Sequence, residues 1–205
     1  MEARDRLLAA VIDELTGSDN QRRGIGDLSL RGLAAAVGTS HRMLIYHFGS
    51  KEGLLIAVVR TMEERQRAAL ADLERELDAD RGLSPADAFR RFWQRLADPA
   101  LWPAERLFFE LYGQALQGRP GTTPFLDGIV DNWLDPLTES AGRYGVPPEQ
   151  ARTHARLGLA VARGLLLDLL ATGNRAEVDA AMERFIAFHP SPERSSPFRA
   201  RQGEH

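Results

Sequence analysis

Residues 29–55 read SLRGLAAAVGTSHRMLIYHFGSKEGLL, and this stretch decides the fold predicted for the chain. Apolar side chains recur in it at helical spacing, with breaks at Gly38 and Gly49. A serine, which is a favoured N-cap residue, stands at the start of the stretch and again shortly after each glycine. The pattern therefore predicts two short helices joined by a tight turn, followed by the start of another helix.

Two short helices joined by a glycine-containing turn are typical of a helix-turn-helix, whose second helix enters the major groove of DNA. Leu33, Ala34 and Val37 give the first helix an apolar side for the second. The turn needs a residue that accepts a positive φ, which Gly38 supplies. No acidic residue occurs from Leu28 to Lys51, although the formal net charge of the whole chain is −3. This favours a local DNA-contacting face over non-specific coating of nucleic acid.

The same 27 residues closely resemble the DNA-binding signature of the tetracycline-repressor family. The resemblance covers a small-residue-rich helix, a recognition helix, and the specific element Phe-x-Ser-Lys-Glu-x-Leu at residues 48–54. Ile45 departs from the pattern, because the family usually has an aromatic residue there. The resemblance implies a sequence-specific transcriptional regulator, usually a repressor, that binds a near-palindromic double-stranded operator as a homodimer.

The resemblance also assigns the DNA contacts. Arg42 is expected to be the main reader of bases, because a guanidinium can bond O6 and N7 of guanine together. Lys51, the only lysine of the chain, is expected to meet a phosphate at the start of a helix. The full set expected at the DNA is Ser29, Arg31, Ser40, His41, Arg42, Met43, Tyr46, His47 and Lys51.

Helical periodicity continues along the rest of the chain and predicts an all-α protein. A long helix is expected from Lys51 to about Asp80, and further helices over residues 85–96, 103–117, 125–144, 148–171 and 175–188. The expected organisation is a helix-turn-helix DNA-binding domain (1–50), a connecting helix (51–80), a ligand-binding and dimerisation domain (81–189), and a disordered tail (190–205).

Aromatic side chains are frequent after Ser84, and at helical spacing such residues usually belong to a core. The resemblance implies instead that this region encloses a pocket for a small effector, which an aromatic lining would make largely apolar or aromatic. Both interpretations stay open at this point. The expected ligand-binding residues are Trp93, Phe109, Glu110, Tyr112, Asn132, Trp133 and His154.

The helix predicted over residues 148–171 is apolar on more than one side and must be buried on both. By resemblance, this helix and the last one pair with their counterparts in a second subunit. Burial within one domain is the alternative. The residues expected in the dimer interface are Leu159, Val161, Leu166, Leu170, Met182, Phe185 and Ile186.

The chain has no cysteine, which excludes disulfides, thiolate metal sites and cysteine nucleophiles. It also lacks a Gly-rich phosphate loop, a Gly-x-Ser-x-Gly elbow and a His-Glu-x-x-His pair. We therefore expect no enzyme, no metal and no cofactor, and a cytoplasmic protein without membrane spans. The competing hypotheses are a helical protein-binding module and a small-molecule-binding protein without DNA readout.

Overall fold

The computed structural model describes residues 2–17, 29–79, 84–143 and 145–188, and the regular elements within those ranges are all helical. The all-α fold expected from the sequence is confirmed. The predicted tail (190–205) lies outside the described residues. The elements are α1 (Ala3–Thr16), α2 (Leu30–Ala36), α3 (His41–Phe48), α4 (Lys51–Ala79), α5 (Pro85–Leu96), η3 (Pro99–Leu101), α6 (Trp102–Leu116), η4 (Thr123–Leu126), α7 (Asp131–Arg143), α8 (Pro148–Thr172) and α9 (Arg175–Phe188).

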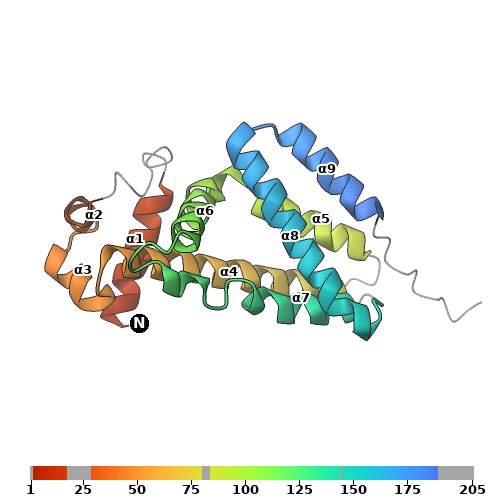
Figure 1. Ribbon diagram of the computed structural model, residues 1–205, viewed down its shortest axis with the longest axis horizontal. Coiled ribbons are helices and arrows are strands. Elements are labelled where there is room, and N and C mark those ends of the chain that lie inside the picture. The colour runs from red at the N-terminus through yellow and green to blue at the C-terminus, as the bar shows by residue number, and fades with distance from the viewer. Residues whose placement is uncertain (1, 18–28, 80–83, 144, 189–205) are drawn as a thin grey trace, which may run out of the picture.

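Helix α4 is the long axis of the molecule, with α1, α2 and α3 at its N-terminal end and α5, α8 and α9 toward its other end (Figure 1). Helix α6 stands between the two groups, and α7 runs beside α4 (Figure 1). The 29 residues of α4 correspond to a length of about 44 Å. None of the helices in the described ranges is both long enough and apolar enough to cross a membrane.

The local signals of residues 29–55 act as predicted. The hydroxyl of Ser29 accepts from the backbone N–H of Gly32 at 3.0 Å, and the hydroxyl of Ser40 accepts from that of Met43 at 3.2 Å. Gly38 lies in the turn between α2 and α3 with a φ of 68°. Because an L side chain is strained at that angle, the glycine fixes where the first helix of the pair ends.

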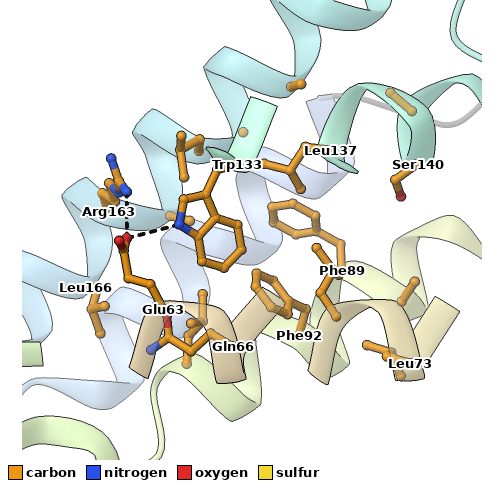
Figure 2. Close-up of a pocket in the computed structure, with 18 of the residues that line it drawn as sticks. Glu63, Gln66, Leu73, Phe89, Phe92, Trp133, Leu137, Ser140, Arg163 and Leu166 are labelled. Atoms are coloured by element: carbon orange, nitrogen blue, oxygen red, sulfur yellow. Dashed lines mark hydrogen bonds and ion pairs between the residues drawn. The ribbon is translucent and has the colours of Figure 1, made fainter. Parts of the chain in front are cut away.

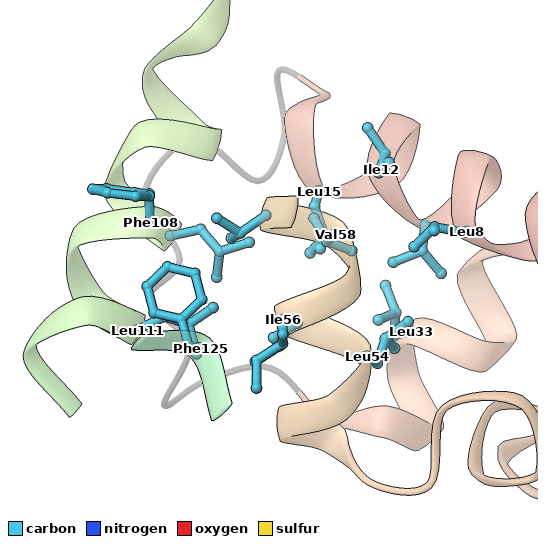
Figure 3. Close-up of a cluster of buried hydrophobic side chains, with 14 of the residues drawn as sticks. Leu8, Ile12, Leu15, Leu33, Leu54, Ile56, Val58, Phe108, Leu111 and Phe125 are labelled. Atoms are coloured by element: carbon cyan, nitrogen blue, oxygen red, sulfur yellow. The ribbon is translucent and has the colours of Figure 1, made fainter. Parts of the chain in front are cut away.

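One apolar cluster holds the helix-turn-helix together (Figure 3). Leu33 of α2 and Leu44 of α3 pack in the same cluster as Leu54 and Val58 of α4. The cluster also contains side chains from α1, α6 and η4, namely Leu8, Val11, Ile12, Leu15, Leu107, Phe108, Leu111, Ala115 and Phe125. The core of the first three helices is therefore completed by helices from later in the chain.

Two further clusters build the other end of the molecule. One joins α4, α5, α7 and α8 through Leu73, Phe92 and Leu134. The other joins α5, α8 and α9 through Trp93, Leu169 and Met182. Helix α5 begins with the expected cap at Ser84, whose hydroxyl accepts from the backbone N–H of Asp87 at 3.2 Å.

The helix predicted over residues 125–144 begins later than expected. Residues 123–126 form the 3-10 helix η4, and Asp127 follows with extended backbone (φ −66°, ψ 113°). Helix α7 starts only at Asp131. The prediction was wrong here because Phe125 is buried in the first apolar cluster and is only 1% exposed. Its contacts with α6 determine the conformation of this segment, which therefore does not continue the α-helix predicted from the apolar spacing.

Gly53 lies where α3 passes into α4, and a Cβ built on it would lie 2.2 Å from the backbone oxygen of Phe48. Replacement by alanine must therefore move backbone, which costs about 1–3 kcal/mol in well-packed regions. We expect Gly53→Ala to lower the thermal unfolding midpoint by about 5 °C, measured by circular dichroism.

Gly113→Ala is the matched control for that measurement. Gly113 lies inside α6, and an added Cβ would meet no heavy atom within 4 Å. Because alanine favours a helix over glycine, this variant should unfold at the same temperature as the wild type or slightly higher. Equal midpoints for wild type and Gly53→Ala would contradict the close approach of Phe48.

Candidate DNA-binding face and ligand cavity

The outer side of α3 exposes a run of side chains suited to DNA contact. His41 and Arg42 are exposed, as are Met43 at 41% and Tyr46 at 79%. Arg31 is exposed on the neighbouring α2. The opposite side of α3 is anchored by Leu44, which is 1% exposed. The fold thus leaves free the face of the second short helix that a helix-turn-helix presents to a major groove.

The other residues expected at the DNA lie at the ends of these helices. Ser29 and Ser40 are exposed, and their oxygens cap α2 and α3. Lys51 is half-buried at the start of α4. His47 is half-buried, with its ring edge-on to that of Tyr46 at 5.0 Å between centroids. Its Nε2 atom is buried and has no hydrogen-bond partner among the described residues.

A cavity of about 170 Å³ lies among α4, α5, α6, α7, α8 and α9. Its walls are mostly apolar, with aromatic side chains from four helices: Phe89, Phe92, Phe108, Phe109, Trp133 and Phe185. Figure 2 shows Trp133, Phe89 and Phe92 directed into this space. The alternative of a solid aromatic core, left open by the sequence, does not hold for this part of the chain.

A buried polar group interrupts the apolar wall. Glu63 of α4 accepts from the indole N–H of Trp133 at 3.0 Å and from Nη2 of Arg163 at 3.2 Å (Figure 2). The same Nη2 donates to the backbone oxygen of Ile129 at 2.7 Å, and the guanidinium lies 5.1 Å from the centre of the Phe108 ring. Burial raises the pKa of Glu63, and its bonds to Trp133 and Arg163 oppose that rise.

Glu105 of α6 is a second buried carboxyl group on the cavity wall, with 6% of its surface exposed. Its Oε1 accepts a short hydrogen bond from the side-chain amide of Gln66. Burial raises the pKa of Glu105 from its ordinary value of 4.5 to about 7, against the opposing effect of the Gln66 hydrogen bond. The negative charge of nearby Glu63 adds to the rise.

Three of the residues expected to bind ligand line the cavity, namely Phe109, Trp133 and His154. Four others do not. Trp93 packs in the third cluster and donates its indole N–H to Asp179 at 2.7 Å, while Tyr112 packs its ring on Phe108 and Phe125. Asn132 is exposed on α7, and Glu110 is half-buried on α6 outside the cavity lining. These four were chosen by residue type and helical spacing, which do not fix the side of the helix that faces the cavity.

The sequence analysis did not single out the polar cavity residues Glu63, Gln66, Glu105 and Arg163. A usable signal existed for two of them. Glu63 follows Val59 and Met62 on the apolar side of α4, and Arg163 interrupts the apolar run of α8. A charged residue on an otherwise apolar helix face must find a partner or a ligand when the face is buried.

Within the single chain, the residues expected at a dimer interface are largely covered by the chain itself. Leu159, Leu166, Met182 and Ile186 are buried within the single chain, and Val161, Leu170 and Phe185 pack against the third cluster. The apolar residues that α8 and α9 direct outward are others: Leu157 is 44% exposed, Leu167 50% and Phe188 66%. The expected set came from the family resemblance and from an α8 that is apolar on more than one side, and neither fixes which side faces outward.

Comparison with known proteins agrees with this geometry. The family profile described as bacterial regulatory proteins, tetR family, matches residues 21–58. A transcriptional regulator from Rhodococcus sp. RHA1 superposes with a TM-score of 0.69 and 23% identity, covering 91% of this chain and 95% of that one. A TetR transcriptional regulator from Legionella pneumophila gives 0.64 and 18% identity, with 92% and 97% covered.

A transcriptional regulator from Saccharomonospora viridis, solved in complex with choline, gives a TM-score of 0.61 at 21% identity, with 91% of this chain and 94% of that one covered. At these identities the solved structures establish the fold alone. No curated protein matches the chain in sequence.

The fold and the exposed face of α3 define a helix-turn-helix protein of the transcription-regulator class with an all-helical second part. The resemblance to the tetracycline-repressor family is confirmed: residues 21–58 match the family model, and the fold is that of solved TetR-type transcriptional regulators.

The raised pKa of Glu105 makes stability depend on pH. The folded chain keeps this proton up to about pH 7, whereas the unfolded chain releases it near 4.5, so the free energy of unfolding falls as pH rises through that window. We expect Glu105→Gln to remove about 2 kcal/mol of the decrease between pH 5 and pH 8, measured by urea unfolding.

Glu110→Gln, on the same helix but outside the cavity lining, is the control and should keep the wild-type dependence on pH. Identical pH profiles for wild type and Glu105→Gln would show that Glu105 is ionised in the folded chain throughout this range.

Proposed function

We propose that the chain is a repressor that binds its operator as a homodimer and is released by a small, largely apolar or aromatic effector bound in the cavity. One observation carries the proposal: α4 and α6 both pack against the helix-turn-helix and contribute residues to the lining of the cavity. The choline complex of the Saccharomonospora relative supports it as well, since that protein of the same fold holds a small organic molecule.

A coupling path follows from the packing. Phe108 of α6 lines the cavity and also belongs to the cluster that holds the helix-turn-helix. Leu111, one turn further along α6, is fully buried in that cluster. A ligand that shifts α6 therefore shifts the support of α3, and it weakens DNA binding by the difference in its affinity for the two arrangements.

DNA geometry supports a dimer. Two recognition helices reach successive major grooves only when they lie about 34 Å apart, which requires a second copy of the chain. The outward face of α8 and α9 is the surface proposed for the pairing, because Leu157, Leu167 and Phe188 expose apolar surface there. This face lies at the opposite end of the molecule from α3 (Figure 1).

Arg42→Ala tests the DNA reader. The preference for operator over a scrambled duplex should fall by about tenfold or more, because a bidentate arginine–guanine contact is lost. The measurement is fluorescence anisotropy over a salt series, with duplexes selected from the source genome by the wild-type protein.

Arg75→Ala is the control, since Arg75 is equally exposed but lies near the far end of α4. Its operator preference should equal that of the wild type. If selection recovers no preferred sequence, or if Arg42→Ala keeps the wild-type preference, the chain does not read DNA through α3 and the protein-binding alternative takes its place.

Leu167→Glu tests the dimer. A carboxylate buried without a partner in the interface should weaken self-association by about tenfold or more, measured by sedimentation velocity. Leu116→Glu is the control, because Leu116 is 69% exposed at the end of α6, away from α8 and α9. Dimers of equal strength in both variants would place the interface elsewhere.

A further inference from the structure

More acidic than basic side chains line the cavity. Three carboxyl groups, those of Glu63, Glu74 and Glu105, line the cavity, and Arg163 is the only arginine or lysine in its lining. The remaining wall is apolar and largely aromatic. An ionised group in such surroundings is costly unless an opposite charge compensates it. The charges inside the cavity therefore constrain which ligands can enter.

Arg163 is already engaged. Its Nη2 bonds Glu63 at 3.2 Å and the backbone oxygen of Ile129 at 2.7 Å, and its guanidinium packs on the ring of Phe108. An anionic ligand would have to compete with Glu63 for this group. Arg163 is therefore hydrogen-bonded to Glu63 and only attracts Glu105 electrostatically, whereas Glu74 pairs with Arg143 instead.

Glu105 has no ion-pair partner within the described part of the chain. Its one hydrogen bond comes from Gln66, whose amide is neutral and compensates no charge. Only 6% of the surface of this residue is exposed. With a pKa of about 7, half of these groups are ionised near neutral pH; the charge of Arg163 acts on Glu105 electrostatically, but burial outweighs it.

Glu74, further along α4, adds a second incompletely bonded carboxyl group. It is 9% exposed, and its Oε1 is buried without a hydrogen-bond partner in the described structure. Its Oε2 meets Nη1 of Arg143 only at 3.4 Å. The cavity lining thus carries carboxylate oxygens from Glu74 as well as Glu105, together with Leu70 and Leu73 of α4.

We propose that the cavity selects a hydrophobic organic cation, with its ammonium group held by Glu105 and its apolar body packed among Phe89, Phe92 and Trp133. Aromatic faces attract a cation electrostatically, so the walls favour the same ligand as the carboxylates. The proposal rests on the proposed function, because it assigns the chemical class of the effector.

The test is a series of three ligands of similar shape and different charge: benzyltrimethylammonium, benzyl alcohol and phenylacetate. Isothermal titration calorimetry on the full chain without DNA should give the order cation, alcohol, anion, with about a tenfold advantage of the cation over the alcohol. Equal affinities, or tightest binding of phenylacetate, would overturn the proposal.

Glu105→Gln keeps the shape and removes the charge. It should abolish the advantage of the cation and leave the affinity for benzyl alcohol within about twofold of the wild type. Glu110→Gln, outside the cavity on the same helix, should keep that advantage. An undiminished advantage in Glu105→Gln would overturn the role of this carboxylate.

The wild-type protein gives an independent readout. Benzyltrimethylammonium has no titrating proton, and its affinity should rise about tenfold from pH 6 to pH 8 as Glu105 ionises. The charged groups that face Glu105 are Glu63 and Arg163, and His154 also lines the cavity. Glu105→Gln separates these contributions, because it should make the profile flat; an unchanged slope would assign the titration to another group.

The calorimetry is independent of DNA binding, so the two proposals can fail separately. Selective operator binding without a preference for the cation would overturn only the ligand class. A preference for the cation in a protein that reads no DNA sequence would overturn only the regulator.

Discussion

Phe108 and Leu111 of α6 pack in one apolar cluster with side chains of α1 and α4, and the position of the helix-turn-helix depends on that packing. Helices α2 and α3 have 7 and 8 residues, too short to be stable alone in water. They bury few large side chains of their own and are stabilised by packing against α1 and α4. Helices α1 and α4 in turn pack against α6. The surface offered to DNA is thus oriented by a helix that follows it by more than fifty residues in the chain.

The same helix forms part of the cavity wall, and the proposed response to an effector depends on this double role. Packed interfaces tend to switch between discrete arrangements more readily than they deform continuously. A ligand among α4, α5, α6 and α8 acts on side chains that have neighbours in the DNA-binding core. Arg60 strengthens the connection, since its Nη2 donates from α4 to the backbone oxygen of Pro124 in η4 at 2.7 Å.

Buried charge is the second constraint. A single chain that only needed stability would fill this space with apolar side chains, because buried ion pairs seldom add net stability. Here three glutamates and an arginine line the cavity, and one of the glutamates, Glu105, has its hydrogen bond from a neutral amide and no ion pair among the described residues. That arrangement lowers the free energy of unfolding of the protein without ligand, and a bound ligand of opposite charge would raise it again. It is therefore more consistent with a ligand-binding role than with a purely structural one.

The sequence by itself determined the helix-turn-helix, because its signals are local: serine caps, a glycine at positive φ and apolar spacing act within a few residues. It also determined most helix boundaries, with the exception of the segment before α7, where the burial of Phe125 overrides the helix predicted from the apolar spacing.

Only the tertiary structure decided which sides of α5, α6, α7 and α8 face the cavity. Aromatic and apolar residues surround these helices on several sides, so periodicity could not tell Trp133 from Trp93, or the outward Leu167 from the inward Leu166. The meeting of Glu63, Glu105 and Arg163 was likewise beyond the sequence, because these residues lie far apart along the chain and are brought together only by the packing of three separate helices.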